Sequence, residues 1–283
     1  MKTIWVLENI RGHRSFYNKF DLLMMISSVI QWKKHHPTFH THVYLDKMSL
    51  ELFQELNILK LWDTNEILPI NKFIDKNVFW ASSKLEALRF TKEPIIIMDN
   101  DFVVYKSFES FLGNKLIATH IENGEDYYIK PLDPIIRKVK HIINRPQLVA
   151  LNCSFLYLPD YKVTQNYTTT SLELMTELTK LKAPNSKYLL YAEQLLLHHL
   201  LTIHKIPFET LLDKEYHCLT NTYNQKRQGF IETEKQNLFF RHYWMDKPKI
   251  QENRDGFNLK NETEQLENLV KNHILTDWSI LNA

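Results

Sequence analysis

The run Pro94-Ile95-Ile96-Ile97-Met98 constrains the fold more than any other segment of the chain. It is continuously apolar, and three successive positions carry the β-branched residue isoleucine. A strand of this kind is typical of the centre of a parallel sheet, where helices cover both faces and no polar alternation is needed. The segment therefore predicts an α/β protein with a buried central strand.

The residues before this strand alternate between strand-like and helix-like patterns. Apolar side chains recur near helical spacing in the predicted helices, and the predicted strands are short and apolar. The expected strands cover residues 2–7 and 40–45, and the expected helices cover residues 16–34, 50–61 and 82–90. This alternation predicts βαβ units and a Rossmann-like, mostly parallel central sheet flanked by helices.

The rest of the chain continues the mixed pattern without repeats or a convincing linker. We expect strands over 116–121, 148–158 and 237–243, and helices over 133–143, 171–181, 192–204 and 262–278. The polar stretch 251–261 predicts a loop. The simplest organisation is one domain over residues 1–283, in which 250–283 forms a C-terminal loop and a closing helix.

Composition removes several classes of function. The chain has only five glycines and neither GxGxxG nor GxxxxGK[ST], which disfavours sites built on a glycine-rich phosphate loop. Its two cysteines, Cys153 and Cys218, form no CxxC pair, so we expect reduced thiols. The net charge of +2 gives no reason to expect a nucleic-acid partner. The N-terminus does not resemble a signal peptide, and the apolar segment 20–30 is too short to span a bilayer. We therefore expect a soluble, cytoplasmic protein, for which peripheral membrane contact stays open.

The candidate metal site follows the central strand directly, as Asp99-Asn100-Asp101. Ligands of open α/β sheets bind at the carboxyl ends of strands. In an extended segment, residues two apart point to the same side, so the carboxylates of Asp99 and Asp101 would face one ligand. Carboxylates and phosphate oxygens are the ligands that Mg²⁺ and Mn²⁺ prefer. The alternative is an ordinary polar turn, since Asp and Asn are common turn residues.

The order of several motifs resembles GT-A glycosyltransferases. Phe79-Trp80-Ala81-Ser82-Ser83-Lys84 precedes a helix, which is followed by the apolar strand and the Asp-Asn-Asp motif. A Glu-Gln helix and a late His…Lys pair come afterwards. This order is most similar to glycosyltransferase family 8, and also to uncharacterised bacterial proteins considered glycosyltransferases. The resemblance covers about residues 79–248 and is discontinuous between the motifs.

The resemblance implies roles for residues on the donor side of the site. Asn152 and Ser154 match a strand that forms the floor of the sugar pocket in family 8, although Ser154 replaces a glycine there. His242 matches the histidine that completes the metal site beside Asp99 and Asp101. Lys247 matches the lysine that binds the diphosphate, although the spacing from His242 is shorter than usual. Lys84 and Asn100 are further expected donor contacts.

The resemblance also implies where the chemistry takes place. Glu193 and Gln194, at the expected start of a helix, match a pair that faces the reacting sugar. Such an enzyme, a hexosyl- or pentosyltransferase, would use a nucleoside diphosphate sugar, with UDP expected, and Mn²⁺ or Mg²⁺. Its acceptor could be a glycan, a lipid-linked sugar or a protein. Glu193 as a general base implies inversion, and Gln194 beneath the sugar implies retention, which we favour slightly.

Two other classes remain open. Haloacid-dehalogenase phosphatases also place Asp-x-Asp after an apolar strand, and Val103 fits their pattern. In those enzymes the motif lies near the start of the domain, whereas Asp99 lies a third of the way along this chain, and no late Asp-Asp pair is found. The other class is a catalytically inactive GT-A fold that binds a glycan or a partner protein.

Overall fold

The structure is a computed structural model of residues 1–283, and it describes residues 1–10, 17–123, 133–142, 149–211, 240–243, 247–254, 257–274 and 278–282. The chain divides into two compact units. The first comprises residues 1–67, 98–111 and 237–283, and the second comprises residues 68–97 and 112–236. The expectation of one domain is not tested by this division and stays a prediction. Among the described residues, no helix is both long and apolar enough to cross a membrane.

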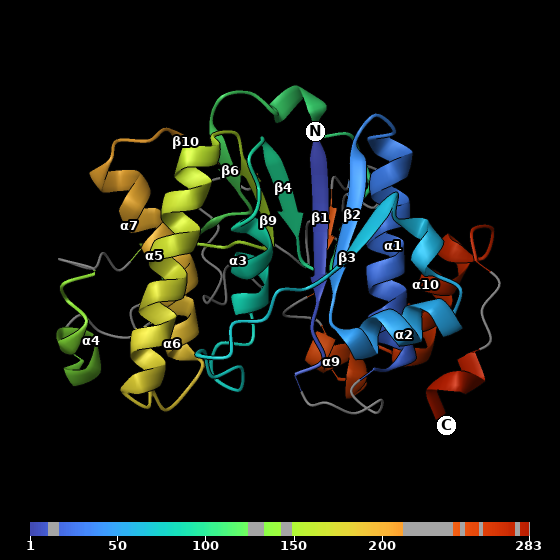
Figure 1. The fold of residues 1–283 in the computed structure, drawn as a ribbon. Coiled ribbons are helices and arrows are strands. Elements are labelled where there is room, and N and C mark those ends of the chain that lie inside the picture. The colour runs from blue at the N-terminus through green and yellow to red at the C-terminus, as the bar shows by residue number, and fades with distance from the viewer. Residues whose placement is uncertain are drawn as a thin grey trace. The chain divides into compact units, whose positions relative to one another are not determined.

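The fold is mixed α/β, with largely parallel strands flanked by helices, as predicted (Figure 1). In the first unit the strands are β1 (Lys2–Leu7), β2 (His40–Leu45), β3 (Thr64–Ile67), β5 (Phe102–Val104) and β11 (Phe240–His242). Its helices are α1 (Lys19–His35), α2 (Lys47–Glu55), α9 (Lys247–Gln251) and α10 (Leu259–Val270), with 3₁₀ turns η2 (Leu59–Leu61), η3 (Glu109–Phe111) and η5 (Trp278–Asn282).

Parallel pairing organises the first unit. β1 pairs with β2 from Lys2 opposite His40 to Leu7 opposite Leu45, and β2 pairs in parallel with β3. β5 and β11 form a separate antiparallel ribbon. The bounds predicted for β1 and β2 are confirmed, whereas β3 was not predicted, because all four of its side chains are exposed and give no apolar pattern.

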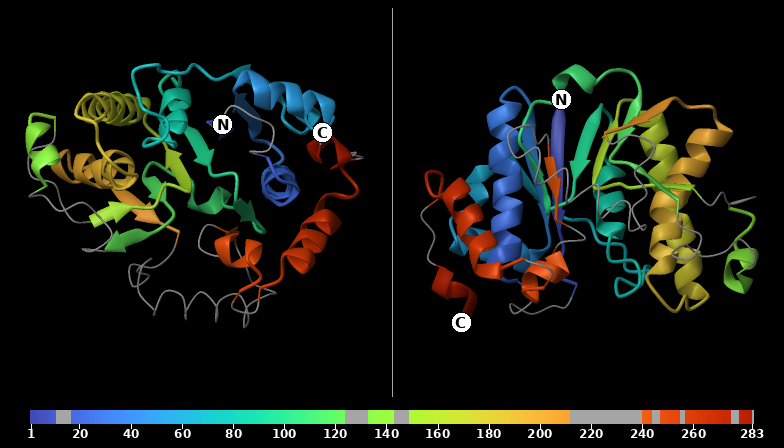
Figure 2. Two further views of the ribbon diagram at one scale, coloured as in Figure 1. Left: turned by 90° about the horizontal axis from the view of Figure 1, so that it is seen from below. Right: turned by 180° about the vertical axis from the view of Figure 1, so that it is seen from behind.

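Helix α1 supplies much of the core of the first unit. Asn18 caps it, because its side chain accepts a hydrogen bond from the backbone N–H of Asp21. Nearly every residue from Phe20 to Trp32 is buried, and α1 packs against β5 and α10, which lies beside it in Figure 2. The hydroxyl of Ser28 accepts from Trp5 Nε1 at 2.9 Å and donates to the carbonyl of Phe102 at 2.6 Å. These bonds fix the start of β5 against β1.

The second unit has its strands in the order β10-β6-β9-β4. These are β4 (Ile95–Met98), which ends where the first unit resumes, β6 (Leu116–Ala118), β9 (Phe155–Leu158) and β10 (Phe208–Thr210), with a separate pair β7 (Ile121–Asn123) and β8 (Val149–Leu151). Its helices are α3 (Ser82–Leu88), α4 (Pro134–Lys138), α5 (Tyr161–Lys180), α6 (Lys187–Leu190) and α7 (Leu196–Ile203), with the π-helical turn η4 (Tyr191–Leu195) between α6 and α7.

Several predictions for the second unit were wrong in detail, among them the strand expected over 116–121, which is divided between β6 and β7, and the helix expected over 133–143, which ends at Lys138. The strand expected over 148–158 is two strands. The backbone N–H of Ser154 donates to the side chain of Asn152, so this segment interrupts the backbone pairing between strands. Helix α5 begins at Tyr161, where Asp160 caps it, rather than at Ser171. Helical structure also begins at Lys187 rather than at Ala192, so Glu193 does not lie in a first turn.

Candidate metal centre

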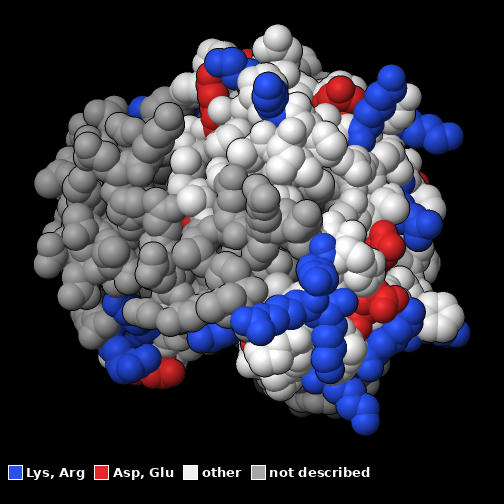
Figure 3. Space-filling model, turned by 90° about the vertical axis from the view of Figure 1, so that its left-hand side faces the viewer, with Lys and Arg blue, Asp and Glu red and all other residues white. Residues whose placement is uncertain are grey.

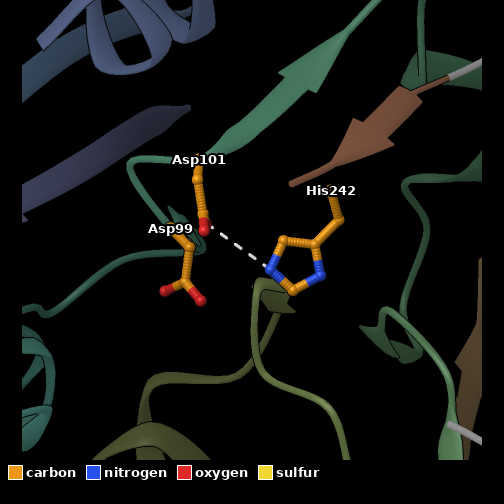
Figure 4. A group of neighbouring side chains, drawn as sticks. All are labelled: Asp99, Asp101 and His242. Atoms are coloured by element: carbon orange, nitrogen blue, oxygen red, sulfur yellow. Dashed lines mark ion pairs between the residues drawn. The ribbon is translucent and has the colours of Figure 1, made fainter. Parts of the chain in front are cut away.

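Asp99 and Asp101 lie in a tight turn that joins β4 to β5. The backbone N–H of Phe102 donates to the carbonyl of Asp99 at 3.1 Å and closes this turn. The extended geometry expected from the sequence is therefore wrong, and the polar-turn interpretation is right about the backbone. The turn nevertheless directs both carboxylates to one place (Figure 4).

The antiparallel ribbon brings the third member of the site to this turn. His242 pairs with Phe102, Arg241 with Val103 and Phe240 with Val104. The backbone N–H of Tyr243 donates to the carbonyl of Asp101 at 3.0 Å, which extends the ribbon to the metal-site turn itself. His242 therefore reaches Asp101 through backbone pairing between segments that are distant in the sequence.

Side chains on either side of His242 fix the register of β11. Arg241 forms a bidentate ion pair with Glu262 of α10, at 2.9 and 3.4 Å, and its guanidinium group lies 4.1 Å from the ring centre of Tyr243. The ring of Phe240 stacks on that of Phe102 with a centroid distance of 4.6 Å. A bidentate pair and a stacked ring both restrict orientation, so the imidazole is held in place by its neighbours.

The donor set formed by Asp99, Asp101 and His242 suits a divalent cation. One ligand atom from each residue lies within 4.8 Å of the others, and His242 Nε2 is 3.5 Å from Asp101 Oδ1. Ligands bound at about 2.1 Å to one ion are at most about 4.2 Å apart, so closure needs a movement of less than about 1 Å. Two carboxylates and an imidazole are a reasonable set for Mn²⁺ or Mg²⁺. The residues present therefore fit a metal ion.

The electrostatics of the turn favour a charged carboxylate at Asp101. Burial raises the pKa of Asp101, but the charge and hydrogen bond of His242, together with the charge of Lys247, outweigh burial and leave the pKa below its ordinary value. A carboxylate that stays ionised is the form that binds a cation. Asn100 points elsewhere, because its side-chain amide donates to the carbonyl of Val6 at 2.9 Å, at the end of β1.

Lys247 lies in the same unit, at the start of α9. Its ammonium group is 3.0 Å from Asp21 Oδ1, and both side chains are about one third exposed. Asp21 was not predicted as its partner, because the two residues are far apart in the chain. The lysine is therefore accessible for an anionic ligand, in exchange for a partly exposed ion pair.

A second group of predicted residues meets in the second unit. Lys84 Nζ lies 2.9 Å from Glu193 Oε1, and both side chains are largely buried. Lys84 also donates to the carbonyl of Cys153 at 3.5 Å, which places it beside the Asn152–Ser154 segment. Gln194 follows in the same π-helical turn, a feature that is frequent at functional sites.

Asn152 and Ser154 belong to a buried polar network that the sequence did not reveal. Asn152 Nδ2 donates to Glu122 Oε1 at 2.8 Å, and Asn152 Oδ1 accepts from the backbone N–H and the hydroxyl of Ser154. His120 Nε2 lies 3.1 Å from the same oxygen of Glu122. The alternation of His120 and Glu122 could have been read as a strand pattern with both polar groups on one face, but nothing in it points to Asn152. Cys218 lies outside the described residues.

The chain belongs to a family of unknown function, DUF6734, whose model matches residues 2–253. No curated protein matches it. Among solved structures, it is similar to the galactosyltransferase LgtC in complex with donor and acceptor sugar analogs, at 11% identity and a TM-score of 0.40, covering 68% of this chain and 70% of that one. An active-site mutant of LgtC gives 13% identity and 0.41, covering 68% and 69%. The glycosyltransferase GlyE in Streptococcus pneumoniae TIGR4 gives 14% and 0.47, covering 99% of this chain and 61% of GlyE.

Proposed function

We propose that this protein is a metal-dependent glycosyltransferase of the GT-A type, which transfers a sugar from a nucleoside diphosphate sugar to an acceptor hydroxyl. The convergence of Asp99, Asp101 and His242 carries the proposal, because a residue expected from motif order alone lies within 3.5 Å of the acidic turn. The sequence resemblance to family 8 adds the substrate class, with UDP as the expected nucleotide.

In this proposal the three residues of the metal centre hold Mn²⁺ or Mg²⁺. The bound cation would supply neutralisation of the diphosphate leaving group, which is the electrostatic requirement of the reaction. Lys247 would exchange its ion pair with Asp21 for a phosphate oxygen. A diphosphate carries more charge than one carboxylate, so the exchange is favourable for this partly exposed lysine.

Glu193 and Gln194 are proposed to face the reacting sugar. Glu193 is positioned by its ion pair with Lys84 Nζ at 2.9 Å. A carboxylate is needed if Glu193 removes the proton of the acceptor hydroxyl, and this role leads to inversion. We slightly favour retention, in which Gln194 lies beneath the sugar and Glu193 orients its hydroxyls.

Calorimetric titration of UDP, GDP and CDP, with and without Mn²⁺, tests the proposal directly. We expect one nucleotide to bind only with Mn²⁺, and Asp101→Ala to abolish this binding. Glu51→Ala is the matched control, because Glu51 is an exposed carboxylate of the same unit, in helix α2, where it forms a 3.9 Å ion pair with Lys47. Absence of nucleotide binding by the wild type would contradict the proposal. Hydrolysis of an aryl phosphate that Asp99→Asn abolishes would instead identify a phosphatase.

The roles of Glu193 and Gln194 need a separate experiment. Once a donor is found, Glu193→Gln should lower kcat while metal-dependent nucleotide binding persists. Proton NMR of the first-formed product then gives its anomeric configuration. An inverted product would exclude retention and assign the general base to Glu193.

A further inference from the structure

A face of the second unit combines lysines with exposed apolar side chains. We call it the basic–apolar face and define it by Ile70, Lys72 and Phe73 of the loop before α3, and by Lys180, Lys182 and Lys187 around the end of α5 and the start of α6. All six residues are exposed. Figure 3 shows lysine and arginine side chains gathered over the lower part of this side of the molecule, with few acidic ones among them.

The loop and the end of α5 are joined by a direct contact. The backbone N–H of Asp75 donates to Thr179 Oγ1 at 3.0 Å, so Phe73 lies close in sequence to a residue that touches the last turn of α5. Lys180 and Lys182 follow Thr179 immediately, and the chain then enters α6 at Lys187. Figures 1 and 2 both place this loop beside the lower ends of α5 and α6.

The loop presents Phe73 from a fixed backbone. The backbone N–H of Asn71 donates to Glu86 Oε1 at 3.1 Å, and Lys76 Nζ forms bonds of 3.0 and 2.9 Å with the buried carboxylate of Glu86. Ile74, the next residue, is buried. Phe73 is nevertheless 78% exposed and Ile70 is 45% exposed. A restrained loop that exposes two large apolar side chains beside lysines is typical of a contact surface rather than of a core.

The charge extends to helix α4, where Arg137 and Lys138 are exposed, and to the exposed Lys140 in the turn that follows it. The hydroxyl of Tyr188 in α6 donates to both oxygens of Asp133, the N-cap residue of α4, at 3.1 and 3.2 Å. This bond ties α4 to α6 and therefore to the lysines around Lys187. No acidic residue occurs from Leu178 to Tyr191, although Lys180 pairs with Glu177 at 2.6 Å.

We infer that the basic–apolar face docks the protein on a lipid bilayer that contains acidic phospholipids. Clusters of several lysines and arginines are attracted to the negative surface of such a membrane. Apolar side chains insert into the headgroup boundary and add to this attraction. A nucleic acid would also be attracted to the lysines and would find a ring for base stacking in Phe73, so the experiment compares the two ligands directly. The aliphatic Ile70 beside Phe73 favours the headgroup boundary of a membrane. The inference is independent of the proposed function, because it concerns binding and not transfer.

Vesicle sedimentation tests the inference on the full chain. Vesicles of phosphatidylcholine with phosphatidylserine should bind the protein, vesicles of phosphatidylcholine alone should bind it poorly, and added salt should release it. The double variant Lys180→Glu/Lys182→Glu should bind at least ten-fold more weakly, since each lysine near an anionic surface contributes about five-fold. The matched control is Lys60→Glu/Lys260→Glu, a double reversal at exposed lysines of the first unit, which should bind as the wild type does.

The apolar contribution separates a membrane from other polyanions. Phe73→Ser should weaken vesicle binding by about ten-fold, because the ring no longer enters the headgroup boundary. Binding of an RNA oligonucleotide of similar charge should be much weaker than vesicle binding. The inference is overturned if the wild type does not bind acidic vesicles at low salt, if the control variant loses binding equally, or if Phe73→Ser has no effect while RNA binds as tightly as vesicles.

Discussion

The two clusters of predicted site residues treat their charges in opposite ways. In the first unit, two carboxylates and an imidazole gather in one turn, and the lysine that influences them, Lys247, already pairs with Asp21. In the second unit, the carboxylate of Glu193 has its own cation, Lys84, at 2.9 Å. The first arrangement is suited to binding an added cation, whereas the second is neutral as it stands. The comparison distinguishes two kinds of charged cluster. The carboxylates of the metal centre need a bound cation to offset their charge, whereas the carboxylate of Glu193 is offset by a lysine of the fold.

The largest expected effect on stability comes from breaking the ion pair between Lys84 and Glu193. Lys84→Met leaves the Glu193 carboxylate buried without its cation, which should lower the free energy of unfolding by about 3–5 kcal/mol. The double variant Lys84→Met/Glu193→Leu should restore most of this loss, because it removes both buried charges. Urea unfolding of Lys84→Met, Glu193→Leu and the double variant measures the coupling between the two charges. If Lys84→Met and the double variant lose the same free energy of unfolding, the charges of Lys84 and Glu193 do not stabilise one another.

The next effect concerns buried histidines that lie in the same unit as the metal centre. His36 Nε2 accepts from the backbone N–H of Phe108 at 2.7 Å, and its Nδ1 lies 3.3 Å from the carbonyl of Trp32, so the ring is neutral in the fold. Burial lowers the pKa of His36 to about 4, and burial, Lys2 and His40 lower the pKa of His42 to about 4. These groups must stay neutral for the first unit to remain folded.

The sign of the pH dependence follows from these values. The unfolded chain, with a histidine pKa near 6.5, binds more protons than the fold does between about pH 4 and pH 6.5, so stability falls as the pH falls through that window. Each histidine accounts for up to about 3 kcal/mol. Urea unfolding at pH 7 and pH 5 should therefore differ, and His36→Gln should reduce the difference. If the stability difference between pH 7 and pH 5 is unchanged in His36→Gln, His36 does not contribute to the pH dependence. Nucleotide binding should be compared above this window, so that loss of binding is not confused with unfolding.

The third effect sharpens the comparison by adding a cation that the metal centre should bind. Mn²⁺ at about a hundred times its Kd should stabilise the wild type by about 2.7 kcal/mol, since it binds only the folded centre. Asp101→Asn should lose this gain, and Lys84→Met/Glu193→Leu should keep it. Thermal unfolding with and without Mn²⁺ measures all three proteins. Loss of the gain in the second-unit variant would show that the two clusters do not act separately.

The parts of the fold that the sequence predicted are those with a local signal. The apolar runs of β1, β2 and β4 and the acidic turn after Met98 are read from neighbouring residues. The β5–β11 ribbon was not predicted as a pair, because its strands have three residues each and lie far apart in the chain. His242 was found only by resemblance of motif order. Its contact with Asp101 depends on the register of that ribbon, which no local pattern specifies.

The distribution of charge on the basic–apolar face could likewise not be predicted from local sequence patterns. The net charge of +2 gave no reason to expect a nucleic-acid partner and left membrane contact open. It could not indicate a basic face, because the whole-chain sum hides the lysines around Thr179 and the α4 residues that Tyr188 ties to them. Only folding places the exposed Phe73 of the loop beside residues that lie about a hundred positions later.

The smallest expected effect on stability is that of Lys247→Ala. The ion pair with Asp21 is about one third exposed, so its loss should change the free energy of unfolding by less than about 1 kcal/mol. The same change should weaken Mn²⁺-dependent nucleotide binding by about ten-fold, because a lysine–phosphate contact is charge-assisted. Asp21→Asn is the matched control, since it removes the same ion pair and leaves the lysine available. Binding should be unchanged or tighter in Asp21→Asn, and equal weakening in both variants would mean that Lys247 supports the fold of the centre and does not bind phosphate.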